Sequence, residues 1–251
     1  MERDTLVSYL NDYLRIKDIK DKCQNGLTVE GPNDVFKVAF AVDSCLAAFE
    51  QAIDTGAQLL IVHHGLFWDR PYRLVGPLFK RIKRLVEGGC GLFAVHLPLD
   101  LHPEVGNNME LFRLLGLQEP RYFAEIDGNK IGVGGVLDPP LSLEKLTERL
   151  SQITGESSLL VQPYGPQKAQ MVGCVSGFAV DLIDEVGMAG YDTFITGETQ
   201  HAYFHHASEW GINIIYGGHY GTETLGLKAL ASHLEEKYDL ETTFLNVPTG
   251  M

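Results

Sequence analysis

The chain has 251 residues, of which 45% are hydrophobic and 21% charged, and its formal net charge is −13. This length and apolar content suffice for one large core or two modest ones. The acidic balance opposes general binding to nucleic acid or to an anionic membrane, because both reward a positive surface. No apolar segment approaches the length of a membrane span and no secretory signal is visible, so we expect a cytoplasmic protein.

Helical and strand-like segments alternate along the chain, which indicates α/β architecture. In the first half we expect, in order, a helix at 6–14, a strand at 36–42, a helix at 46–55, a strand at 58–62, a helix at 78–87 and a strand at 91–95. In the second half we expect a helix at 142–152, strands at 158–161 and 171–175, a helix at 180–188, a strand at 193–196, a helix at 201–209, a strand at 212–216, a helix at 224–235 and a strand at 242–247.

The strand-helix-strand order occurs twice, which indicates an internal repeat. Sliding the chain on itself by 134 residues aligns Gly31 with Gly165 and Gly56 with Gly190. A loop is shorter in the second half, and beyond it the offset becomes 123 residues, which aligns His96 with His219. We therefore predict two duplicated, intertwined α/β units with mixed sheets, the first at residues 1–125 and the second at 126–251.

The repeat aligns two H-x-x-x-[D/E] patterns. The first runs from His96 to Asp100 and the second from His219 to Glu223, and each follows an apolar strand. Duplication would place both patterns around one pseudo-symmetric cleft.

A histidine pair ends the apolar run at 59–62, where open α/β sheets place their ligands. Adjacent residues on a strand point to opposite faces, so His63 and His64 are better suited to two metal ions than to one. With His219, Asp100 and Glu223 they form a set of three imidazoles and two carboxylates. This set suits two divalent ions such as Zn, Fe, Mn or Ni, held about 4 Å apart.

Two further residues are candidates for moving protons. His96 is a possible ligand, although we favour a donor that orients a carboxylate or a proton shuttle. Glu198 follows a strand end and is a candidate general base or an acceptor for a ligand, while an ordinary acid at a helix N-terminus is almost as good an explanation. The basic run from Lys80 to Arg84 is either the solvated face of a helix or a patch that attracts an anionic substrate.

The sequence resembles the NIF-three-like family, whose members are known as GTP cyclohydrolase I type 2 homologues. The matching stretches are QNGLTVEG at 24–31, IVHHG at 61–65, HLPLDLHPEVGNN at 96–108, FITGE at 194–198 and GHYGTE at 218–223. The resemblance implies a duplicated α/β fold, a dinuclear metal centre and a toroidal homohexamer. In length the chain resembles the short bacterial members of the family. The family's ligand positions fall on His63, His64, Asp100, His219 and Glu223.

These observations lead to a metal-dependent hydrolase that acts on a nucleotide or another small heterocycle, with a metal-bound hydroxide as nucleophile. The family name implies GTP as one possible substrate. A non-enzymatic protein that delivers or buffers metal ions is the alternative. A ring that encircles nucleic acid is a weaker alternative, because the acidic balance opposes it.

Overall fold

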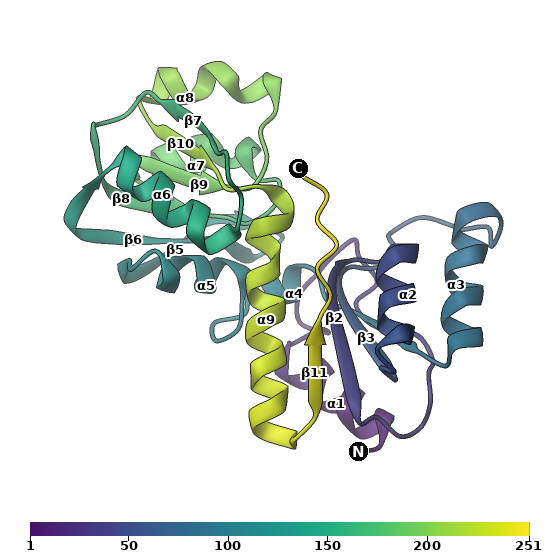
Figure 1. Cartoon of the computed structure of the whole chain (residues 1–251). Helices are drawn as coiled ribbons and strands as arrows, with labels where there is room; N and C mark the ends of the chain where they lie inside the picture. Colours follow the sequence, from purple (N-terminus) through teal and green to yellow (C-terminus); the bar gives the residue numbers. More distant parts are fainter. Residues whose placement is uncertain (251) are drawn as a thin grey trace. The chain divides into compact units, whose positions relative to one another are not determined.

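The computed structural model describes residues 1–250 and confirms a mixed α/β fold with two mixed sheets (Figure 1). The residues group into two compact units, one formed by 1–105 with 226–247 and the other by 106–225 with 248–250. Helix α9 (His219–Tyr238) begins in the second unit and ends in the first. The chain therefore returns to the first unit late in the sequence. The predicted division at residues 125 and 126 stays a prediction.

The first unit is built on a five-stranded sheet in the order β1-β4-β3-β2-β11. Its strands are β1 (Gly26–Val29), β2 (Lys37–Asp43), β3 (Leu59–His64), β4 (Gly91–Ala94) and β11 (Glu241–Phe244). All neighbours are parallel except β1, which runs antiparallel to β4 at the edge. The central strands β2, β3 and β4 therefore all end at the same edge of the sheet.

Consecutive residues of β2, β3 and β4 are buried, whichever face of the sheet their side chains point to. Both faces of this sheet are therefore covered, as is usual for parallel strands. One face packs against α2 through Phe49 and against α3 through Leu85. Besides α9, the helices of this unit are α1 (Arg3–Tyr13), α2 (Leu46–Asp54), α3 (Gly76–Gly88) and the short α4 (Leu97–Asp100). The other face carries Phe40 and Ile61, which are also fully buried.

The second unit has a six-stranded sheet in the order β5-β6-β8-β9-β10-β7. Its strands are β5 (Gln118–Ile126), β6 (Asn129–Ser142), β7 (Leu160–Pro163), β8 (Lys168–Cys174), β9 (Thr193–Thr196) and β10 (Asn213–Tyr216). Strands β8, β9 and β10 are parallel, while β7 is antiparallel to β10 and β6 is antiparallel to both β5 and β8.

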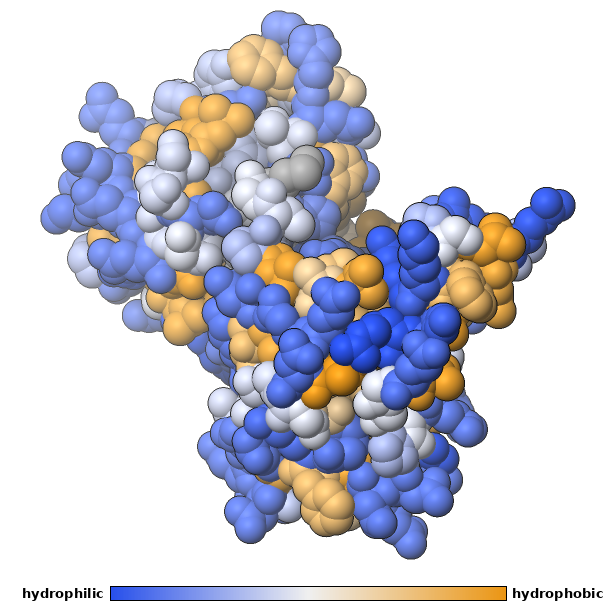
Figure 2. All heavy atoms as spheres, turned by 45° about the vertical axis from the view of Figure 1, so that its right-hand side comes forward, coloured by the Kyte–Doolittle hydropathy of each residue, from blue (hydrophilic) through white to orange (hydrophobic). Residues whose placement is uncertain are grey.

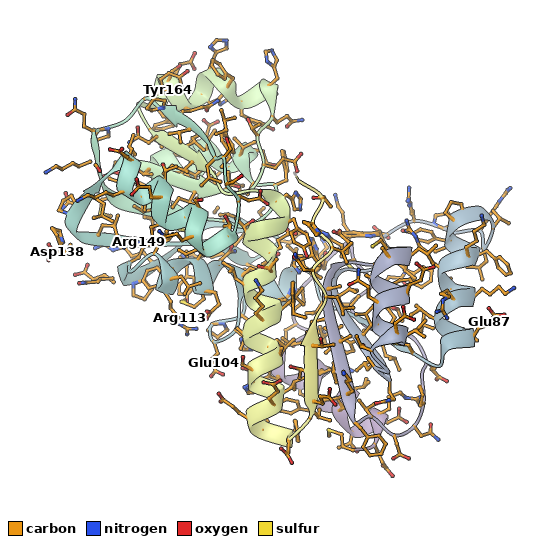
Figure 3. All side chains as sticks on the ribbon, viewed as in Figure 1. Glu87, Glu104, Arg113, Asp138, Arg149 and Tyr164 are labelled. Carbon is orange, nitrogen blue, oxygen red and sulfur yellow. The ribbon has the colours of Figure 1, made fainter. Side chains whose placement is uncertain are left out.

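Helices cover both faces of this second sheet as well. They are α5 (Asn107–Leu114), α6 (Leu143–Thr154), α7 (Ile183–Met188) and α8 (Phe204–Trp210), with single 3-10 turns at Val180–Leu182 and His201–Tyr203. Helices α5 and α6 share one hydrophobic cluster with Ile195 and Ile215, and α7 and α8 share another with Phe194 and Ile214. Arg149 on α6, labelled in Figure 3, donates from Nη1 to the Leu115 carbonyl at 2.6 Å and ties α6 to the end of α5.

The two sheets share one pattern over four strands. In each, three parallel strands are flanked by an antiparallel edge strand, in the order β1-β4-β3-β2 and β7-β10-β9-β8. Both units therefore present the carboxyl ends of three parallel strands at one edge. In open α/β sheets this edge is the usual place for a ligand.

The surface mixes polar and apolar residues. Figure 2 shows separate orange groups of apolar residues among blue hydrophilic ones on the face in view. On α3 and just before it, Leu74, Val75, Phe79 and Val86 are more than half exposed. None of the helices within residues 1–250 is long and apolar enough to cross a membrane.

Candidate metal centre

Three histidines gather at the carboxyl edge of the first sheet. His63 and His64 are the last residues of β3, and His96 follows the end of the neighbouring strand β4. One ligand atom from each of the three lies within 4.8 Å of the others. The ring centroids of His63 lie 4.9 Å from His64 and 5.0 Å from His96. Sequence analysis placed all three near a metal, and the structure brings them together.

His63 is fully buried and held from both sides. Its Nδ1 lies 3.0 Å from the carbonyl oxygen of Val95, and its Nε2 lies 3.6 Å from Oδ2 of Asp100. A carbonyl oxygen can only accept, so Nδ1 carries the hydrogen and Nε2 is left with a lone pair. The nitrogen that faces Asp100 is therefore the one able to bind a metal.

His64 is oriented in the same way by a neighbouring strand. Its Nδ1 lies 2.8 Å from Oδ1 of Asp43, the last residue of β2. Asp43 was not among the predicted site residues, although it directly follows the strand predicted at 36–42. His63 thus contacts the end of β4 and His64 the end of β2, while one ligand atom of each lies within 4.8 Å of the other. The expectation that the two histidines bind two different ions stays a prediction.

His96 is held by Asp21, which the sequence analysis also missed. Both carboxylate oxygens of Asp21 lie 3.1 Å from His96 Nδ1, and Oδ2 also accepts from the backbone N–H of Leu97 at 2.9 Å. The N–H of Cys23 and the amide of Asn25 donate to the same carboxylate. Burial alone would raise the pKa of Asp21, but these hydrogen bonds and the charge of His96 outweigh it and lower that pKa.

Replacing Asp21 with asparagine is expected to lower the free energy of unfolding by about 2 kcal/mol, because buried hydrogen bonds to a charged acceptor are lost. Since the folded pKa of Asp21 is depressed, its contribution is complete above the unfolded pKa of about 3.9 and disappears as the pH falls through the folded value. Urea unfolding from pH 7 to pH 3 measures this, with the exposed Asp18→Asn as control. Equal stability of D21N and wild type at pH 7 would contradict it.

The second unit places its candidate ligands on the first turn of α9. His219 and Glu223 are four residues apart on one helix face, and His219 Nε2 lies 3.2 Å from Glu223 Oε1. The predicted helix began at Thr224, whereas α9 begins at His219, directly after β10 and two glycines. The helix, rather than a loop, therefore sets the spacing between the two side chains.

Glu198 orients His219 from the end of β9. Its Oε2 lies 2.7 Å from His219 Nδ1, so Nδ1 donates to Glu198. In the neutral imidazole, Nε2, which faces Glu223 Oε1 at 3.2 Å, is then the nitrogen able to bind a metal. Of the two roles considered for Glu198, this contact is the one expected of an acceptor that orients a ligand.

Gly177, in the loop after β8, holds the ends of the second sheet together. Its carbonyl accepts from the N–H groups of Gly197 at 2.8 Å and Glu198 at 3.1 Å, and its own N–H donates to Thr222 Oγ1 at 3.0 Å. At φ +61° it has a backbone that favours glycine, and a Cβ there would overlap Oε1 of Glu223. Sequence reasoning missed this residue, which carries no chemistry of its own.

Other residues in and near the sequence motifs also have structural partners. Asn108 accepts from the Ser176 N–H and donates to the Ile131 carbonyl, which joins α5 to the sheet of its unit. Trp68 packs on the core of the first unit, and its ring meets His96 edge-on at 5.0 Å between centroids. The basic run lies on α3, where Lys83 pairs with Glu87, labelled in Figure 3, at 3.6 Å.

The donors in both units fit a divalent transition metal. Nitrogen lone pairs of neutral imidazoles beside carboxylate oxygens are the ligands that Zn, Fe, Mn and Ni accept, and carboxylates offset the ionic charge. In each unit a histidine Nε2 lies close to a carboxylate oxygen, His63 to Asp100 and His219 to Glu223. The residues present are therefore able to bind metal.

The chain also matches a known protein family along its length. The model of the family described as Duf34/NIF3 (NGG1p interacting factor 3) matches residues 1–250. The chain belongs to this family. The resemblance inferred from the sequence motifs is thus confirmed.

Relatives in the Duf34/NIF3 family match the chain along its length. A Deinococcus radiodurans protein called GTP cyclohydrolase 1 type 2 homolog is 42% identical over 249 residues, which are 99% of this chain and 94% of the relative. A Pyrococcus horikoshii protein of the same name is 41% identical over the whole of both chains. The crystal structure of a Thermus thermophilus protein superposes with a TM-score of 0.91 at 45% identity, again covering 100% of both.

Proposed function

We propose that this Duf34/NIF3 protein is a metal-dependent hydrolase that acts on a nucleotide or another small heterocyclic compound. In this proposal two divalent ions are held by a single set of ligands, namely His63, His64, Asp100, His219 and Glu223. The observation that carries the proposal is the orientation of the three imidazoles. Each has its Nδ1 against an oxygen acceptor, of Val95, Asp43 or Glu198, so that each Nε2 is a ready ligand.

The proposal assigns distinct tasks to the side chains. A divalent ion, when bound, polarises a substrate and makes water a stronger acid. Asp100 and Glu223 would neutralise part of the ionic charge. Glu198 would keep His219 in one tautomer and one orientation.

His96 is proposed to move protons. Its Nδ1 is fixed against Asp21, so its Nε2 is the atom that would accept or return a proton beside the His63 and His64 rings. Asp21 would hold the ring in one orientation during such a transfer. The neighbouring Trp68 ring shields one edge of His96 from solvent.

Hydrolysis by the metal-loaded protein tests the proposal. We expect the purified chain, loaded in turn with Zn²⁺, Mn²⁺, Fe²⁺ and Ni²⁺, to hydrolyse at least one member of a panel of nucleotides and free heterocycles. A chelator should abolish turnover, and adding the metal back should restore it. Liquid chromatography with mass detection identifies the product. Metal uptake and transfer to an acceptor without any turnover would instead support a metal-delivery protein.

We also propose the toroidal homohexamer that the family resemblance implies. The exposed apolar side chains of Phe79 and Val86 on α3 support association, since monomers seldom leave such groups uncovered together. Light scattering on the purified protein measures the assembly, which should have six times the 27.8 kDa mass of the chain.

A further inference from the structure

A cavity of about 320 Å³ lies in the second unit beside the candidate metal centre. It sits where β9 and β10 end and where β7 begins, because Leu160 of β7 pairs with Tyr216 of β10. Glu198, which orients His219, forms part of its wall. Its volume is at the lower end for small-molecule sites and suits one ring system rather than a whole nucleotide.

The residues that line the cavity are acidic, hydroxyl-bearing or apolar, and none is basic. Two carboxylates, Glu156 and Glu198, face hydroxyl-bearing Ser158 and Thr199, and no lysine, arginine or histidine is among the lining residues. Leucines and Tyr216 supply the apolar remainder. A phosphate in this cavity would meet two negative charges, with no basic side chain in the lining to offset them. A planar group rich in N–H donors would meet apolar walls and carboxylate acceptors.

Glu156 is held in place by its backbone, while its carboxylate forms no hydrogen bond or ion pair within residues 1–250. It follows Gly155, the left-handed cap that ends α6. Its carbonyl accepts from Ser151 Oγ at 2.5 Å, and its N–H donates to Thr154 Oγ1 at 3.4 Å. The carboxylate oxygens are therefore available to a ligand.

A glycine at the start of α9 makes room for this side chain. A Cβ on Gly218 would lie 2.8 Å from Glu156 Cγ, and Gly218 has φ +84°, which disfavours other residues. Gly218 therefore keeps the Glu156 side chain beside the turn that carries His219. The second carboxylate, on Glu198, has only its Oε2 bound to His219 Nδ1, so Oε1 can accept from a ligand.

We propose that this cavity binds the amino-bearing end of the substrate, a planar heterocycle whose N–H groups donate to Glu156 and Glu198, and that it excludes phosphate. Any phosphate of a nucleotide substrate then lies outside this cavity. The assignment of the ligand as substrate rests on the proposed function, whereas binding itself does not require turnover or metal.

Binding of guanosine and inosine tests the proposal, because inosine lacks only the 2-amino group. We expect calorimetry on the full chain to show guanosine binding about tenfold tighter than inosine, the effect of one hydrogen bond to a charged acceptor. Inorganic phosphate should not compete with guanosine. Inosine binding as tightly as guanosine, or phosphate displacing guanosine, would overturn the proposal.

Two pairs of variants locate the site. Glu156→Gln should weaken guanosine binding about tenfold and leave inosine binding unchanged, whereas Glu148→Gln on the exposed side of α6 should change neither. Ser158→Trp should fill the cavity and abolish binding of both nucleosides, while Ser157→Trp, outside the lining, should not. Equal effects within either pair would refute the assigned position.

Mn²⁺ binding, measured separately by calorimetry, distinguishes failure of this inference from failure of the proposed function. Guanosine binding weakened about tenfold in E156Q with Mn²⁺ binding intact supports the cavity, whatever the turnover. Mn²⁺ binding without any guanosine binding overturns the cavity assignment and leaves the metal proposal standing. Guanosine binding without Mn²⁺ binding supports the cavity and counts against the metal centre.

Discussion

Replacing His63 with alanine is expected to weaken metal binding by about 100-fold or more and to abolish metal-dependent turnover. Loss of a residue that only orients a ligand typically costs 10- to 100-fold in affinity, and here a ligand itself is removed. His63 is fully buried, and its Nε2 lies 3.6 Å from Asp100. Alanine leaves that carboxylate without its imidazole neighbour. Calorimetric titration with Mn²⁺ and elemental analysis of the purified variant measure the effect.

His102 provides the matched control. It is a buried histidine of the same unit, but both of its ring nitrogens are engaged by the chain, Nε2 with the Tyr13 carbonyl at 3.0 Å and Nδ1 with the N–H of Val105 at 3.1 Å. His102→Ala should lower stability and leave Mn²⁺ affinity unchanged. If H63A binds Mn²⁺ as tightly as wild type, or if H102A loses as much affinity, His63 is not a ligand.

The strands that carry the site could be predicted because they are buried on both faces. Residues 59–62 are all apolar, and 212–216 are apolar except for Asn213. The strands predicted at 58–62 and 212–216 match β3 and β10 within two residues at each end. The repeat also relates the antiparallel edge strands of the two sheets. An offset of 134 maps Gly26 of β1 onto Leu160 of β7, so the predicted strand at 158–161 implies a matching strand near Gly26, where the sequence analysis has none.

The hairpin of β5 and β6 was missed because glycine disfavours strands. Three glycines fall in the middle of β6, and each is required by a close approach. A Cβ on Gly134 would lie 2.5 Å from the Tyr191 ring, and one on Gly132 would overlap the Phe123 ring. The Phe123 ring of the paired strand β5 and the distant Tyr191 ring therefore require glycines in β6, against the local preference.

The candidate ligands were predictable, whereas the residues that orient them were not. Imidazoles and carboxylates stand out in a sequence because their chemistry suits metals. Asp21 and Asp43 look like ordinary surface acids in the sequence, and only the pairing of strands brings them to His96 and His64.

The start of α9 was missed because it also depends on a contact with a distant segment. Gly221 lies in the first turn of α9, although glycine disfavours a helix. A larger residue does not fit there, because a Cβ on Gly221 would lie 2.8 Å from Thr154 Cβ.

Replacing Gly177 with alanine is expected to lower metal affinity by at least about tenfold, although the added side chain is only a methyl group. A Cβ at this position would overlap Glu223 Oε1 and lie 3.3 Å from His219 Nε2, so the carboxylate must move away from the imidazole. The same residue fixes the Glu198 backbone through its carbonyl. The substitution therefore affects the proposed ligands Glu223 and His219 as well as Glu198, which orients His219. We expect metal affinity to fall at least as much as when a single orienting residue is lost.

Gly190→Ala separates this effect from backbone strain. Gly190 also has a positive φ, +81°, but a Cβ there would meet nothing within 4 Å. Both variants should lose about 1 kcal/mol of unfolding free energy from the left-handed backbone, whereas only G177A should lose Mn²⁺ affinity in calorimetry. Equal Mn²⁺ affinities for the two variants would mean that Glu223 does not bind the metal from the position it occupies beside Gly177.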